Sequence, residues 1–149
     1  MNYKRIVVII IIIILILLGG MFLFQENSMK KVTVNDVEFS VPSKYQDQMD
    51  STHLLRLTSG ENIYFINVLN SSDVKFFVND YVAHKNTTEN KSVNISKLDY
   101  SNSTIYKSVV SDNSSIVHYW FLKDGKSCEI YTGTADSNTD NFILDIIKA

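Results

Sequence analysis

Apolar and polar side chains alternate in short stretches from residue 32 onward, a pattern typical of β-strands with one buried face. In VTVNDVEFSV, residues 32–41, the Asn35-Asp36 pair suits the positive φ values of a tight hairpin turn. Pairing across this turn places the apolar side chains on one face: Val32, Val34, Val37, Phe39 and Val41. The pattern therefore predicts a hairpin, and we expect a short helical turn after it at residues 43–50.

A second hairpin is predicted from residues 53–58 and 62–69, which flank the turn sequence Ser59-Gly60-Glu61. The run IYFINVL within it is almost continuously apolar, as in a strand that is covered on both faces. We therefore place this strand at the centre of the sheet.

The clearest hairpin signal is SIVHYWFLK-DG-KSCEIYTG, where Asp124-Gly125 is a strong two-residue turn. Because side chains alternate across a strand, the turn also predicts the register and the two faces. One face has the pairs Lys123 with Lys126, Phe121 with Cys128, Tyr119 with Ile130, and Val117 with Thr132. The other face pairs Trp120 with Glu129 and His118 with Tyr131.

Two further segments carry apolar residues at helical spacing. Residues 73–85 follow Ser72, a residue type that favours the N-cap position, and residues 136–148 carry an apolar stripe that ends at Lys148. Between them, residues 86–104 predict an edge strand or a long loop, and residues 105–110 predict a strand. The whole pattern predicts an α+β fold, an antiparallel sheet packed with two helices.

An uncharged apolar run precedes this domain. Residues 6–24, IVVIIIIIILILLGGMFLF, would span a hydrocarbon core of about 30 Å as a helix. A cleaved secretory signal is the alternative, but its apolar region is shorter and ends at small residues, where Met21 to Phe24 stand here. A lipoprotein is excluded because Cys128 is the single cysteine. We expect one N-terminal transmembrane helix that anchors the chain in the lipid bilayer.

The topology rests on flanking charge and on glycosylation motifs. Lys4 and Arg5 nearly balance Lys30 and Lys31, so charge only mildly favours a cytoplasmic N-terminus. N-x-[ST] motifs occur mildly above chance, although an Asn-rich chain with polar loops is an equal explanation. These glycosylation candidates are Asn70, Asn86, Asn90, Asn94, Asn102 and Asn113. We expect a cytoplasmic tail at 1–5, a tether at 25–31 and an extracytoplasmic domain at 32–149.

Composition excludes several classes of function. From Val32 onward the chain has 10 Lys and Arg against 15 Asp and Glu, so it is net acidic and unsuited to nucleic acid. His53, His84 and His118 have no metal-ligand spacing, and no phosphate-binding glycine loop or paired-carboxylate site occurs. Cys128 falls on an apolar face and is expected in the core. We expect no metal, no cofactor and no catalytic residue of a recognisable motif.

The predicted register gathers one set of side chains with binding potential. His118, Trp120, Glu129 and Tyr131 share a face of the third hairpin. Aromatic residues in a sheet usually belong to the core, but a partly covered face of this kind would bind a partner or small ligand.

Several segments together resemble known proteins: VEFSVPSKY, the helix after a long strand, HYWFLKDGKSCEI and the closing FILDIIKA. They resemble small anchored extracytoplasmic proteins of methanogenic archaea and, more distantly, the PsbP-like fold, named for an extrinsic photosystem subunit. The resemblance implies an anchored α+β domain and no site residues. Pilin-like subunits also join an apolar helix to a sheet domain, but the leader and the early helix glutamate typical of them are missing.

The function expected from the sequence is a membrane-anchored extracytoplasmic binding or interaction domain. Its partner would be a protein or a small ligand at the cell surface. Two alternatives remain: a small cell-surface hydrolase whose site no motif reveals, and a structural component of the cell envelope.

Overall fold

The fold is mixed α+β, with antiparallel sheets, as predicted. The structure is a computed structural model that describes residues 9–17, 28–100, 103–110 and 116–148. Besides a helix at residues 9–17, these ranges contain β1 (Met29–Val34), β2 (Val37–Pro42), β3 (Gln46–Ser51), β4 (Leu54–Ser59), β5 (Asn62–Leu69), α2 (Val74–Thr88), β6 (Val93–Tyr100), β7 (Ser103–Val110), β8 (Val117–Lys123), β9 (Lys126–Thr132) and α3 (Thr139–Lys148).

The strands form two sheets instead of the single sheet that was expected. β1 and β2 pair only with each other, and the remaining strands form a seven-stranded sheet in the order β3-β4-β5-β9-β8-β7-β6. Every pair in both sheets is antiparallel. β5, the strand predicted at the centre, lies one place from the middle strand β9.

One face of the large sheet, which we call the core face, carries the main hydrophobic core. Leu55, Ile66 and Ile130 point to this face from neighbouring strands and are fully buried. The β1–β2 hairpin and α3 cover it, through residues that include Phe39 and Ile143. Burying an aliphatic side chain of this size contributes about 2 kcal/mol, so this layer supplies most of the hydrophobic stabilisation.

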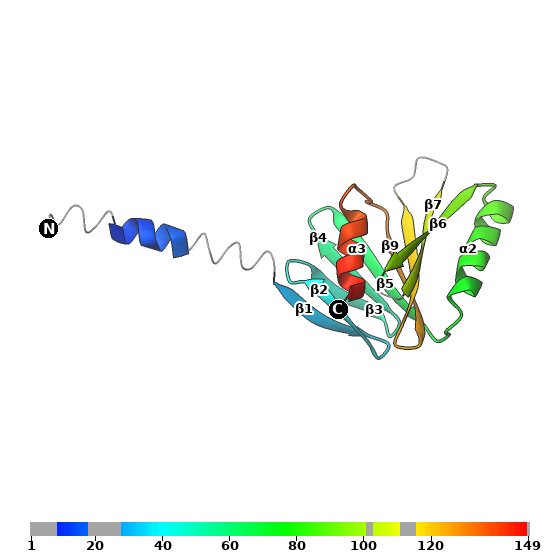
Figure 1. The fold of residues 1–149 in the computed structure, drawn as a ribbon, viewed down its shortest axis with the longest axis horizontal. Helices are drawn as coiled ribbons and strands as arrows, with labels where there is room; N and C mark the ends of the chain where they lie inside the picture. Colours follow the sequence, from blue (N-terminus) through cyan, green and yellow to red (C-terminus); the bar gives the residue numbers. More distant parts are fainter. Residues whose placement is uncertain (1–8, 18–27, 101–102, 111–115, 149) are drawn as a thin grey trace.

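Helix α2 covers the opposite face, which we call the α2 face. In Figure 1, α2 and α3 lie on opposite sides of the large sheet. α2 contacts mainly β8 and β6, and its Tyr81 ring packs against His118 and Trp120 with centroid distances of 4.5 and 5.0 Å. The helix therefore covers the β8 side of this face, and Phe65 and Tyr131 on β5 and β9 stay half-buried.

The predicted hairpins and their turns are confirmed. Asn35 and Asp36 adopt positive φ values of 44° and 62°, and Gly125 adopts 75°. The five apolar residues of the first hairpin are buried on one side. In the β8–β9 hairpin, all six predicted pairs are present.

Two local predictions were wrong. Residues 43–50 do not form a helical turn, because the backbone from Gln46 to Ser51 pairs with β4 as the edge strand β3. All six of its side chains are exposed, so burial imposes no alternating pattern on this strand. The N-cap of α2 is Asp73, not Ser72: its carboxylate accepts a hydrogen bond from the Phe76 backbone N–H at 3.0 Å.

Part of the predicted anchor lies within the described residues. Residues 9–17 are helical, and each of their isoleucine and leucine side chains is 49–67% exposed. Among the residues that the structure describes, no helix is both long and apolar enough to cross a membrane. Residues 6–8 and 18–24 of the predicted anchor, and the tail at 1–5, lie outside the described residues.

Candidate functional site

The structure brings His118, Trp120, Glu129 and Tyr131 together on the α2 face. Because β8 and β9 pair in the predicted register, His118 lies opposite Tyr131, and Trp120 lies opposite Glu129. His118 and Glu129 meet diagonally, with His118 Nδ1 2.7 Å from Glu129 Oε1. A carboxylate only accepts hydrogen bonds, so Nδ1 carries the hydrogen that joins them.

Ring stacking fixes this cluster from both sides. Phe65 on β5 stacks on Tyr131 at 4.8 Å between centroids, Tyr131 on His118 at 5.1 Å, and His118 on Trp120 at 5.3 Å. The interplanar angles of these three pairs are 13°, 20° and 10°. The four rings therefore form one row of stacked rings that runs from β5 over β9 to β8. Burial raises the pKa of the Tyr131 phenol, with a smaller contribution from the nearby Glu129 charge.

Trp120 is more buried than a binding surface requires. It is 2% exposed, because α2 lies over it at Tyr81. The side chains of His118 and Glu129 are 13% and 15% exposed. The indole of Trp120 therefore serves mainly as packing between α2 and the sheet, and Glu129 is the polar group beside it.

A groove opens beside this cluster, between α2 and β5. We call it the α2 groove, and its volume is about 310 Å³. It is lined by Asn67, Leu69, Phe77, Asp80, Tyr81, His84, Trp120 and Glu129. The four residues from α2 recur at spacings of three and four, so they share one side of the helix.

Of this lining, only Trp120 and Glu129 were expected at a binding site from the sequence. Phe77, Asp80, Tyr81 and His84 recur at helical spacing in the sequence, but nothing there marks Asp80 and His84 as part of a site. Nothing in the sequence indicated that this side of α2 faces β5 and β9. The contact between helix and sheet could be found only from the structure.

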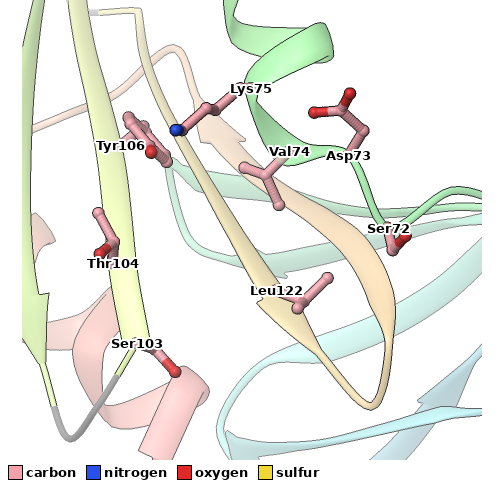
Figure 2. Close-up of a pocket in the computed structure, with 8 residues that line it drawn as sticks. All are labelled: Ser72, Asp73, Val74, Lys75, Ser103, Thr104, Tyr106 and Leu122. Carbon is pink, nitrogen blue, oxygen red and sulfur yellow. The ribbon is translucent and has the colours of Figure 1, made fainter.

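A second hollow lies at the start of α2, with a volume of about 370 Å³. Figure 2 shows its lining: Ser72, Asp73, Val74, Lys75, Ser103, Thr104, Tyr106 and Leu122. The first backbone N–H groups of a helix attract anions. Here the Asp73 carboxylate already accepts from the Phe76 N–H, so the helix supplies its own anion.

A Ser-His-Glu row crosses the α2 face and invites comparison with a hydrolase. Ser108 on β7 lies opposite His118, which binds Glu129. Ser108 is 0% exposed, however, and its Oγ has no hydrogen-bond partner among the described residues. A nucleophile needs both a base within hydrogen-bonding reach and access to the substrate. Ser108 has neither, so this row does not form a catalytic triad.

The other residues considered from the sequence lie apart from the groove or inside the core. Cys128 is buried, as predicted, and burial raises the pKa of its thiol to about 12, far from a reactive thiolate. His53 lies before β4, away from His118 on β8. Among the described residues, no group of three or more His, Cys, Asp or Glu side chains could hold a metal ion.

Four of the glycosylation candidates are accessible. Asn70, Asn86, Asn90 and Asn94 are exposed. Asn102 and Asn113 lie outside the described residues. Glycosylation stays a prediction, and four of its acceptor side chains have the exposure it requires.

One cluster on the core face was missed by the sequence analysis. Lys107 Nζ lies 2.7 and 2.8 Å from the two carboxylate oxygens of Asp140, and the Tyr119 hydroxyl donates to the same carboxylate. Desolvation alone would raise the pKa of Asp140, but the hydrogen bonds from Lys107 and Tyr119 outweigh it and lower that pKa. Burial and the Asp140 contact raise the Tyr119 pKa. The cluster joins the start of α3 to β7 and β8.

Replacing Trp120 by Ala is expected to lower the free energy of unfolding by about 3 kcal/mol or more, because it leaves a cavity under α2. Denaturant unfolding of the full chain in detergent, followed by circular dichroism, measures the loss. Leu122→Ala is the matched control, since Leu122 follows on the same strand and face but is 45% exposed. Equal, small losses in both variants would contradict the packing role of Trp120.

Asp140 is expected to contribute stability that is lost in acid. Its pKa is lowered on folding, so the contribution is present above the unfolded-state pKa of about 4 and disappears as the pH falls through the folded-state value. Asp140→Asn should cost about 1 kcal/mol at pH 7, a modest value because the side chain is 44% exposed, and the loss should shrink towards pH 3.

Asp145→Asn is the matched control for this prediction. Asp145 lies on the same helix and pairs with Lys148 at 3.0 Å, but both side chains are at least half exposed. Unfolding curves between pH 3 and pH 8 compare the two variants with the parent chain. If Asp140→Asn shows the same loss at every pH, the ion pair is not its cause.

Comparisons with known proteins leave the family open. No protein-family model matches the chain, and no curated protein matches it. Its fold is similar to the solution structure of cyanobacterial PsbP (CyanoP) from Synechocystis sp. PCC 6803, with 12% sequence identity and a TM-score of 0.48. The match covers 76% of this chain and 84% of that one. This neighbour is a PsbP protein, and the sequence also resembled the PsbP-like fold. A likeness this distant carries no argument about function. The resemblance to methanogen proteins is untested and stays a prediction.

Proposed function

We propose that the chain is a membrane-anchored binding domain that holds its partner or ligand in the α2 groove, outside the cytoplasm. The observation that carries this proposal is the half-covered α2 face. α2 covers the β8 side, and a groove of about 310 Å³ remains between the helix and β5. Ligand sites in proteins are typically concave and mostly apolar, with a few fixed polar groups.

The groove meets these requirements through rigid elements. Its apolar walls come from Leu69, Phe77 and Trp120, and its fixed polar group is Glu129. Glu129 is held by His118 at 2.7 Å and faces Asn67 Nδ2 at 3.5 Å. A carboxylate held in this way keeps its orientation before a ligand arrives, which reduces the entropy lost on binding.

The anchor is supported by the N-terminal helix. Nine consecutive isoleucine and leucine residues, 9–17, are about half exposed or more, so the domain does not cover them. A soluble surface seldom presents so continuous an apolar segment. Burial in a bilayer removes this surface from water, and the uncharged run continues to residue 24 in the sequence. Exposed Asn70 and Asn94 agree with an extracytoplasmic location.

The full chain is expected to stay in the membrane fraction of cells after an alkaline carbonate wash, because only a spanning or deeply buried segment resists that treatment. Protease added to intact cells should then degrade the domain. A chain that carries Ile12→Lys and Leu15→Lys is the comparison, since charges in the core of the span disfavour insertion. Release of the parent chain by carbonate, or a domain protected from protease until lysis, would refute the anchored topology.

A photo-crosslinking amino acid at position 84 is expected to capture the partner in living cells. The His84 side chain lines the groove and is 60% exposed, so the substitution should not disturb packing. Position 79 is the matched control, because Asn79 is exposed on the same helix and does not line the groove. A captured protein would appear as a new band in gel electrophoresis, and a captured small ligand as added mass on the chain in mass spectrometry. Identical products from both positions, or none from either, would contradict a binding groove.

A further inference from the structure

The charges that line the α2 groove are unbalanced. Asp80 from α2 and Glu129 from β9 both line it, and no lining residue is lysine or arginine. His84 is the one basic residue of the lining, and its nearest acidic partner is Glu89, at 3.9 Å from its Nε2. The groove therefore combines two carboxylates with the aromatic side chains Phe77, Tyr81 and Trp120.

His118 Nδ1 holds Glu129, but lysine or arginine neutralises neither groove carboxylate within the part of the chain that the structure describes. Across residues 28–100, 103–110 and 116–148, Asp80 and Glu129 form no ion pair with lysine or arginine, whereas Glu89 and Asp140 are paired with lysines at 2.6 and 2.7 Å. Lys85 lies beside the Tyr81 ring, with its Nζ 5.6 Å from the ring centroid. Lys85 donates to Glu89 Oε1 at 2.6 Å and is thereby held outside the groove lining.

We propose that the α2 groove binds an organic cation, an alkylammonium group of a small amine or of a lysine side chain. This inference rests on the proposed function and names the chemistry of its ligand. The ammonium group would lie between the carboxylates of Asp80 and Glu129, and its alkyl chain would contact Phe77 and Leu69. A volume of about 310 Å³ suits a small group of this kind.

The chain contains its own reporter for this site. Trp120 is its single tryptophan and lines the groove, so the indole emission responds to a bound cation. The full chain in lipid nanodiscs would be titrated with n-butylammonium and, separately, with n-butanol, which has the same alkyl chain without the charge. We expect a saturable emission change with the amine and none with the alcohol. An equal response to both compounds would overturn the proposal.

Two single substitutions test whether the groove charge is responsible. Asp80→Asn is expected to weaken butylammonium binding about fivefold, the effect of losing one partly exposed ion pair. Glu61→Gln removes the same charge from the exposed turn at the other end of β5 and should leave binding unchanged. Equal weakening by both substitutions would show that the effect comes from the net charge of the domain, and it would overturn the proposed cation site.

A second pair of ligands identifies the source of the cation. N-acetyl-lysine methylamide and its uncharged norleucine counterpart would be titrated in the same way. Saturation by the lysine compound assigns the site to a protein side chain, and saturation by butylammonium alone assigns it to a free amine. If neither cation binds while position 84 still captures a partner in cells, the binding function stands and the cation inference is wrong.

Discussion

The strand β9 joins the two halves of the domain, and most of the structure depends on its pairing. It binds β8 through a two-residue turn and β5 from a segment about 60 residues earlier. Its alternation sends Cys128 and Ile130 to the core face and Glu129 and Tyr131 to the α2 face. A slip of one residue would exchange these sets and bury a charge in the main core. The register that stabilises the core therefore also places the carboxylate of the groove.

The parts of this arrangement that depend on neighbouring residues were predictable. Asn35-Asp36 and Asp124-Gly125 adopt positive φ values, and each turn determined the register of its hairpin without help from the rest of the chain. The four residues His118, Trp120, Glu129 and Tyr131 were found together for the same reason. Their common face follows from a period of two along paired strands, which is a local property.

The parts that depend on distant residues were not predictable. β3 is polar and exposed, so only its backbone pairing with β4 makes it a strand. The sequence did not indicate that Asp80 and His84 line a groove, because the place of α2 beside β5 is decided by packing on His118 and Trp120. Lys107 and Asp140 meet across 33 residues for a similar reason. A groove made by two such elements has no signature within either of them.

The two faces of the sheet differ in how completely they are covered. The core face is covered by the β1–β2 hairpin and α3. Its charged residues Lys107 and Asp140, with Tyr119, bind the start of α3 to the sheet. The α2 face has a histidine–carboxylate pair beside an open groove, but the Ser108 hydroxyl opposite His118 is fully buried. Trp120 on the same face is buried as well, because Tyr81 of α2 packs on it. Ser108 does not line the groove, so this hydroxyl cannot act as a nucleophile on a ligand held there.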